Sequence, residues 1–148
     1  MNYCCYSEGG KKTVDLWKGY KKVLVFIFIV YLAALFRITV FRSGFDFSNA
    51  FLGGEVNLVP FADLLKVFAS DKKAFIYLFF GNIVWFVPFG FLLRRITAIK
   101  AGWIILLGFF LSLFIETMQL VFGVGVFETD DLLLNTLGAA LGAKVMRK

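Results

Sequence analysis

The stretch AGWIILLGFFLSLFIETMQLVF, residues 101–122, is an apolar run that carries Glu116 and Gln119 near its C-terminal end. A bilayer core of about 30 Å is crossed by a helix of about 20 apolar residues. A carboxylate inside such a span costs roughly 3 kcal/mol even on translocon-insertion scales, so it needs a partner or a function. The stretch therefore predicts a membrane-spanning helix with a candidate functional site near one end.

The amino-acid composition also indicates a membrane protein. Of the 148 residues, 60% are hydrophobic and the mean hydropathy is +0.83, whereas soluble domains are about 45–50% apolar. The net charge of +6 does not favour nucleic-acid binding, because basic residues of membrane proteins gather in cytoplasmic loops. The chain has no histidine, which excludes chemistry built on an imidazole base or ligand for this chain acting alone. We expect an integral membrane protein that binds no nucleic acid.

Four apolar runs are candidate spans, and they comprise residues 23–41, 74–93, 101–122 and 132–146. The first three are long enough for spanning helices, but the fourth reaches only about 22 Å. The fourth helix must therefore take Asp130 and Asp131 into its first turn, thin the bilayer, or enter as a half-span. The predicted fold is all-α, with residues 1–22 as a basic cytoplasmic leader and 23–148 as a single membrane domain.

The distribution of charge predicts that both chain ends lie in the cytoplasm. In that orientation, eleven of the sixteen basic residues are cytoplasmic, as positive-inside placement requires, namely Lys11, Lys12, Lys18, Lys21, Lys22, Arg94, Arg95, Lys100, Lys144, Arg147 and Lys148. The same orientation places seven acids outside, namely Asp46, Glu55, Asp63, Asp71, Glu128, Asp130 and Asp131.

The segment 42–73, between the first two spans, is too apolar for a simple linker. Pro60 suits the first turn of a helix, and an apolar stripe follows at helical spacing, formed by Phe61, Leu64, Leu65 and Phe68. We expect an interfacial or re-entrant helix against the outer leaflet. A stripe that only packs on the other helices is the alternative.

Polar residues of the third and fourth spans each share one helix face. Glu116 and Gln119 are three residues apart. A stripe on the fourth helix, at spacings of four, three and four, comprises Asp131, Asn135, Gly138 and Gly142. Its two glycines form the small-xxx-small pattern of closely packed membrane helices. The simplest partner is the third span, which would bring Glu116 and Gln119 toward Asn135.

Two further features belong to the same region. Asn82 lies in the second span, where Pro88 interrupts the hydrogen-bond ladder and frees the carbonyl of Val84. Thr129 or Asp130 could cap the fourth helix, where a carboxylate also suits the helix dipole.

The polar residues allow a structural and a functional interpretation. Asn82, Gln119 and Asn135 could serve only as interhelical hydrogen bonds. Glu116 favours a function, with Arg37 or Arg42 as possible counter-ion.

The acids by themselves do not specify a chemistry. Such carboxylates could hold a divalent cation or form an acid–base pair, but neither signal is specific. We expect no metal site and no cofactor.

Four motifs, in order, resemble the VanZ-like family over about residues 36–148: Asn57-Leu58-Val59-Pro60-Phe61, Gly81-Asn82 leading to Phe86-Val87-Pro88-Phe89-Gly90, Glu116-Thr117-Met118-Gln119, and Phe127-Glu128-Thr129-Asp130-Asp131-Leu132 continuing to Gly138. The resemblance implies a small bacterial plasma-membrane protein, of a family whose namesake confers resistance to the lipid-bearing glycopeptide teicoplanin. It adds Asn57 to the candidate ligand-binding residues and Pro60, Pro88 and Gly90 to the structural ones. The chain departs from many members, which have an arginine near Gly125 and an aspartate in place of Glu128.

Three functions follow as expectations. The first is a non-catalytic envelope protein whose outward site, formed by Asn57, Asn82, Glu116, Gln119, Asp130, Asp131 and Asn135, binds a lipoglycopeptide, a cell-wall precursor lipid or a partner. The second is a membrane enzyme that acts on a lipid or wall precursor through Glu116 with Asp130 or Asp131. The third is a small transporter or assembly subunit, which would require an oligomer of unknown size.

Overall fold

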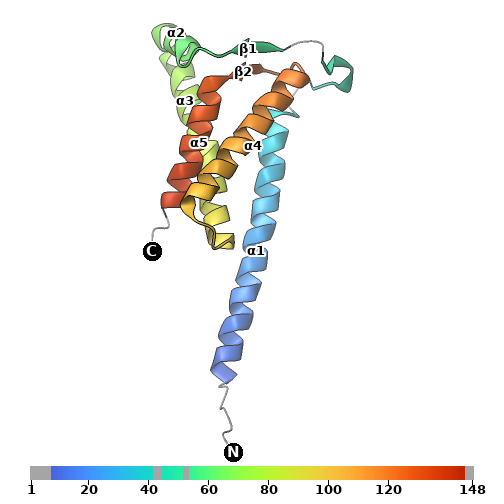
Figure 1. Ribbon diagram of the computed structural model, residues 1–148, viewed down its shortest axis with the longest axis vertical. Helices are drawn as coiled ribbons and strands as arrows, with labels where there is room; N and C mark the ends of the chain where they lie inside the picture. The colour runs from blue at the N-terminus through green and yellow to red at the C-terminus, as the bar shows by residue number, and fades with distance from the viewer. Residues whose placement is uncertain (1–7, 42–44, 52–53, 146–148) are drawn as a thin grey trace, which may run out of the picture.

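The computed structural model describes residues 8–41, 45–51 and 54–145, and it consists mainly of helices (Figure 1). The helices are α1 (Glu8–Thr39), α2 (Ala62–Ser70), α3 (Lys72–Ile96), α4 (Ala101–Val121) and α5 (Thr129–Lys144). Within α1, the segment Trp17–Thr39 is long and apolar enough to cross a membrane, and so are α3 and α4. The helical fold and the membrane class are therefore as expected. Helix α1 begins inside the predicted leader and continues into the first span without interruption.

Helix α5 packs on α3 with the two backbones almost in contact. A Cβ atom added at Gly138 would lie 2.2 Å from the carbonyl oxygen of Ile83, and one at Gly142 would lie 2.1 Å from that of Val87. Gly90 of α3 faces α5 just as closely, since its added Cβ would be 2.0 Å from a carbonyl oxygen of α5. The predicted close-packing face is thus real, but its assigned partner was wrong. The two glycines meet backbone carbonyls of α3, whereas Asn135 of the same stripe contacts α4.

Helix α5 begins at Thr129 and includes Asp130 and Asp131 in its first turn, which is one of the three alternatives that the short apolar run left open. The predicted side-chain cap is wrong. Glu128 occupies the N-cap position, and its side chain makes no capping hydrogen bond. The Asp130 carboxylate instead accepts a hydrogen bond from the backbone of Phe61, in the segment before α2.

The segment before α3 contains the expected short helix, α2, with two differences. The helix begins at Ala62 rather than at Pro60, and Phe61 before it has a left-handed backbone with φ of 61°. The second difference is a pair of short parallel strands, β1 (Glu55–Asn57) and β2 (Val126–Glu128), in which Asn57 is opposite Glu128. Three residues per strand are too few to show an alternating pattern, and parallel partners lie far apart in sequence.

Helix α3 continues through Pro88. Next to the expected opening at Val84, the Tyr31 hydroxyl of α1 donates a hydrogen bond of 2.7 Å to the carbonyl oxygen of Trp85. Apolar side chains of α1, α3, α4 and α5 form the main core, which includes Leu35, Phe86, Ile104 and Ala139.

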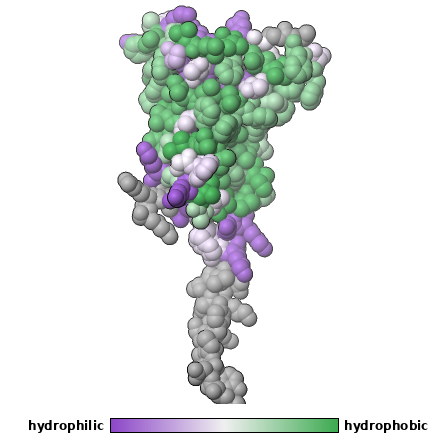
Figure 2. All heavy atoms as spheres, viewed as in Figure 1, coloured by the Kyte–Doolittle hydropathy of each residue, from purple (hydrophilic) through white to green (hydrophobic). Residues whose placement is uncertain are grey.

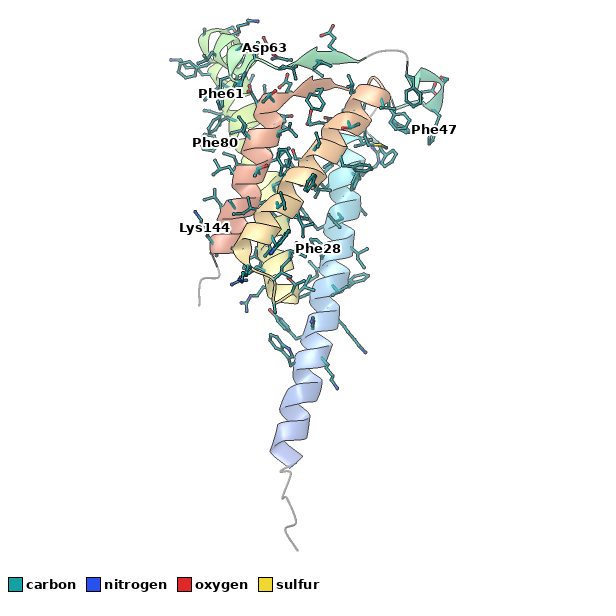
Figure 3. All side chains as sticks on the ribbon, in the orientation of Figure 1. Phe28, Phe47, Phe61, Asp63, Phe80 and Lys144 are labelled. Atoms are coloured by element: carbon teal, nitrogen blue, oxygen red, sulfur yellow. The ribbon has the colours of Figure 1, made fainter. Side chains whose placement is uncertain are left out.

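On the face seen in Figure 2, hydrophobic side chains form a broad belt, and hydrophilic residues lie toward the two ends of the bundle. At one end lie α2, β1 and β2, together with the described carboxylates Asp63, Glu128, Asp130 and Asp131; we call it the acidic end. Figure 3 shows Phe61 and Asp63 at this end and Lys144 near the opposite one. The opposite end, which we call the basic end, includes Lys21, Arg94, Arg95, Lys100 and Lys144.

Candidate functional site

A cavity of about 240 Å³ opens at the acidic end between α2, α3 and the start of α5. Its polar lining comprises Thr39, Asp63, Tyr77, Asn82, Gln119, Glu128, Asp130 and Asp131. Four of these side chains are carboxylic acids, and no lysine or arginine lines the cavity. The apolar part of the lining includes Leu64 and Trp85. The cavity therefore offers a concentrated negative potential beside an apolar wall.

Asp131 joins three elements at the base of this cavity. Its carboxylate accepts a hydrogen bond from the Nδ2 of Asn82 in α3, which assigns that amide a clear partner. Its carboxyl group is also an electrostatic neighbour of Glu116 in α4. Glu116 is only 1% exposed, and its Oε2 accepts the backbone N–H of Glu128 at 3.1 Å. Two neighbouring ionised carboxylates repel each other, so a cationic group close to both would be stabilising.

Asp130 has a structural contact of its own. Its Oδ1 accepts the backbone N–H of Phe61 at 2.6 Å, and its side chain is buried. Next to it, Asn57 donates from Nδ2 to Asp63 Oδ2 at 2.7 Å, and Asn57 Oδ1 accepts the N–H of Val59 at 3.1 Å. The Asn57 and Asp130 side chains thus hold the turn before α2 against the cavity.

Asn135 and Gln119 do not meet Glu116, which corrects the expectation that they would. Asn135 Nδ2 donates to Ser112 Oγ in α4 at 2.9 Å, one turn deeper in the bundle. Gln119 Nε2 donates to the carbonyl oxygen of Thr39 in α1 at 3.2 Å, although its side chain also lines the cavity. The two amides therefore connect helices at different depths rather than forming one cluster with Glu116.

In the part of the chain that the structure describes, no arginine forms an ion pair with Glu116. Arg37 donates from Nη1 to the carbonyl oxygen of Phe41, and it makes no ion pair there. Arg42 lies outside the described residues. Within the described ranges, no group of three or more acidic or thiol side chains has a geometry that could hold a metal ion.

Asp63 and Ser112 belong to the site region but were not predicted as site residues from the sequence. Asp63 lines the cavity and also pairs with Lys66 at 2.6 Å. Ser112 precedes Glu116 by four residues, so helical spacing alone could have placed it on the same face. Asp63 carried a weaker signal, because an acid on the polar face of an amphipathic helix is usually only solvated.

Glu128 lies at the rim of the cavity, outside the spanning segments. Burial raises the pKa of its carboxyl group, and the neighbouring carboxylates of Asp130 and Asp63 raise it further. Glu128 therefore takes up a proton at a higher pH than an ordinary glutamate.

The fold and the site together define a helical membrane protein with an acidic pocket at one end of its bundle. A comparison with protein families shows that the chain belongs to the VanZ/LLP1 family, whose match covers residues 28–147. The resemblance of the four motifs is thereby confirmed. Neither a search of curated proteins nor a search of solved structures found a match.

Proposed function

We propose that this chain is a multi-pass protein of the bacterial plasma membrane, with its acidic end outside and both chain ends inside. The charge pattern supports this orientation, because the described basic residues of the α3–α4 connection, of α5 and of the start of the first span share one end. In this orientation α5 enters from outside with its acidic first turn near the membrane surface, and α2 lies at the outer leaflet. The apolar residues Phe61, Leu65 and Phe68 of that segment are exposed, as an interfacial helix requires.

The pocket would then bind a ligand that is presented at the outer surface of the membrane. We propose that this ligand is a lipid-anchored peptide, either a lipoglycopeptide of the teicoplanin type or a cell-wall precursor lipid, and that binding lowers susceptibility to the drug. The observation that carries this proposal is the pocket itself, in which four carboxylic acids and two amides meet without a basic residue in the lining. Such a lining attracts ammonium and amide N–H groups, which peptides supply.

The partly apolar surroundings strengthen the electrostatic part of the argument. Charges that face each other at a distance of about 4 Å interact several times more strongly near a protein surface than in bulk water. The cavity lies beside Trp85 and Leu64 rather than in open solvent, and Asp131 is held in place by Asn82. A cationic group that enters would also relieve the repulsion between Asp131 and Glu116.

Drug susceptibility of a sensitive Gram-positive host tests this function. Expression of the wild-type chain should raise the inhibitory concentration of teicoplanin, and Asp131→Asn, which keeps the shape of the side chain, should remove most of the effect. Glu55→Gln is the matched control, because Glu55 is an exposed acid at the same end that does not line the cavity. An unchanged susceptibility in cells with normal amounts of folded, membrane-localised protein would contradict the resistance role. Calorimetric titration of the purified protein with teicoplanin and with precursor lipid would identify the ligand.

A membrane enzyme is the second candidate, and the contact between Glu116 and Asp131 favours it. A carboxyl pair that shares one proton can provide an acid and a base in the same site. Glu116→Gln retains an oxygen acceptor for the N–H of Glu128 but removes the base. Mass spectrometry of wall-precursor lipids should then show a product that wild-type cells accumulate and Glu116→Gln cells lack. Identical lipid pools in both strains would argue against catalysis.

A further inference from the structure

We propose that the basic end carries a second site, which binds the phosphate group of an anionic phospholipid from the inner leaflet. A cavity of about 420 Å³ lies there between the start of the first span and the end of α3. Its lining comprises Trp17, Lys21, Arg94, Arg95, Ile96, Thr97 and Ala98. Three cationic side chains thus converge from two helices on one hollow, with a hydroxyl and an indole beside them. This site is separate from the acidic pocket and does not depend on the proposed drug-binding role.

Arg95 is the residue that points most directly to a missing ligand. Its Nε is buried and has no hydrogen-bond partner among the described residues. The guanidinium carbon lies 5.8 Å from the centroid of the Phe91 ring, a contact that satisfies the cation partly but gives the N–H no acceptor. A buried donor without an acceptor is unfavourable, and the planar guanidinium group matches two phosphate oxygens.

The charge balance at this end supports an anion. The acidic residues whose side chains the structure describes lie in the C-terminal part of α4, in β1, β2 and the first turn of α5, or in the segment 45–71, all toward the acidic end. The side chains of Glu8 and Asp15 in α1 lie outside the described ones. The one ion pair within the described ranges joins Lys66 to Asp63, also at that end. Lys21, Arg94 and Arg95 therefore lack a carboxylate partner among the described side chains. Arg94 is also held in place, because its Nη1 donates to the carbonyl oxygen of Ile99.

The position of the cavity favours a lipid over a soluble phosphate. The basic residues that line the cavity lie at the end of α3 and near the start of the first span. Figure 2 shows hydrophilic residues below the hydrophobic part of the bundle, and such a boundary is the depth of a lipid phosphate. Trp17 is 56% exposed, and tryptophan is enriched at this depth of membrane proteins. On the membrane side of the cavity, α1 exposes Val23 and Phe26, which can contact acyl chains. Basic pockets between helices on the cytoplasmic side are suited to anionic headgroups.

Lipid retention by the purified full-length protein tests this site. The protein is titrated with phosphatidylglycerol, with phosphatidylcholine and with inorganic phosphate, and bound lipid is counted by native mass spectrometry alongside thermal stability. We expect phosphatidylglycerol to be retained and to raise the melting temperature, and phosphatidylcholine to do neither. Arg95→Gln and Lys21→Gln should each weaken retention of phosphatidylglycerol by about fivefold, the effect of one lost basic group near a lipid surface.

Lys72→Gln is the matched control, because Lys72 is an exposed lysine at the acidic end of α3. It should retain phosphatidylglycerol like the wild type. Lys21 is itself exposed, so Lys21→Gln keeps the test decisive if Arg95→Gln does not fold. Equal retention of the two lipids by the wild type, or wild-type retention by folded Lys21→Gln, would overturn the proposal. Stabilisation by inorganic phosphate without a preference for phosphatidylglycerol would overturn the assignment to a lipid.

Discussion

The backbone N–H of Phe61 donates a hydrogen bond of 2.6 Å to Oδ1 of Asp130, although the two residues are 69 positions apart. Phe61 has a left-handed backbone, which is unfavourable for a bulky side chain. The contact fixes this turn against the first turn of α5 and thereby closes one side of the acidic pocket. Asp130 thus has a structural role, whereas Asp131 lines the cavity and accepts a hydrogen bond from Asn82.

Asp130→Ala should destabilise the folded protein by about 1–3 kcal/mol, because a partly buried N–H of a left-handed residue loses its acceptor. The free energy of unfolding in detergent, measured by denaturant titration, checks this. Glu55→Ala removes an exposed carboxylate of neighbouring β1 and should change stability by less than about 0.5 kcal/mol. Equal effects of the two substitutions would show that the Asp130 contact contributes nothing.

Gly138→Ala should separate α5 from α3. The new methyl group would lie 2.2 Å from the carbonyl oxygen of Ile83, a backbone atom that cannot move without shifting the helix. We expect a loss of more than about 2 kcal/mol, as overpacking typically costs 1–3 kcal/mol. Gly81→Ala is the control, since a Cβ at Gly81 meets nothing within 4 Å. Thermal unfolding of both variants would show whether close packing, rather than glycine content, stabilises the helix pair.

The Asn135–Ser112 hydrogen bond should contribute a coupling of about 0.6 kcal/mol, the average for polar pairs between membrane helices. A double-mutant cycle with Asn135→Ala and Ser112→Ala measures it through the free energies of unfolding. Their Nδ2 to Oγ distance is 2.9 Å, and both residues are buried. If the two changes in the free energy of unfolding simply add in the double mutant, the hydrogen bond makes no net contribution to stability.

The free energy of unfolding should fall as the pH rises above the usual pKa of a carboxyl group, in part because of Glu128. Burial and the carboxylates of Asp130 and Asp63 raise the pKa of Glu128 above its usual 4.5. The folded state therefore holds this proton more tightly than the unfolded chain. The stabilisation from Glu128 is complete at a pH below its pKa in the unfolded chain. It is lost as the pH rises through its pKa in the folded protein. Lys66 pairs with Asp63, so it offsets only that neighbour.

Glu128→Gln should flatten this part of the pH profile, because the amide cannot titrate and the backbone N–H to Glu116 remains. Melting temperatures of both proteins between mildly acidic and neutral pH provide the measurement. Parallel profiles for the two proteins would mean that Glu128 does not contribute.

The orientation can be read from cysteine labelling in intact cells. After Cys4 and Cys5 are replaced by serine, single cysteines are introduced as Glu55→Cys at the acidic end and Lys100→Cys at the basic end. A membrane-impermeant maleimide should label Glu55→Cys in intact cells and Lys100→Cys only after lysis. The reverse pattern would place the acidic pocket in the cytoplasm and would exclude a role at the outer surface.

Much of the site followed from local spacing, but its pairings did not. Helical periodicity placed Asp131 and Asn135 on the glycine stripe. The short apolar run offered acids in the first turn of α5 as one of three alternatives, and that alternative is present. The same periodicity could not say that Asn82 would reach Asp131 or that Asn135 would choose Ser112. A face is a property of one helix, whereas a partner depends on how several helices pack together.

The sequence by itself determined the membrane class, the three long spans, the opposite charges at the two ends and the family, because these depend on composition, length and local order. Only the tertiary structure decided that the glycines of α5 meet α3, that β1 pairs with β2, and that Asp130 supports Phe61. These contacts join residues distant in the chain, and backbone fit selects among partners of similar polarity. The acidic pocket exists because this packing brings α2, the outer part of α3 and the start of α5 together.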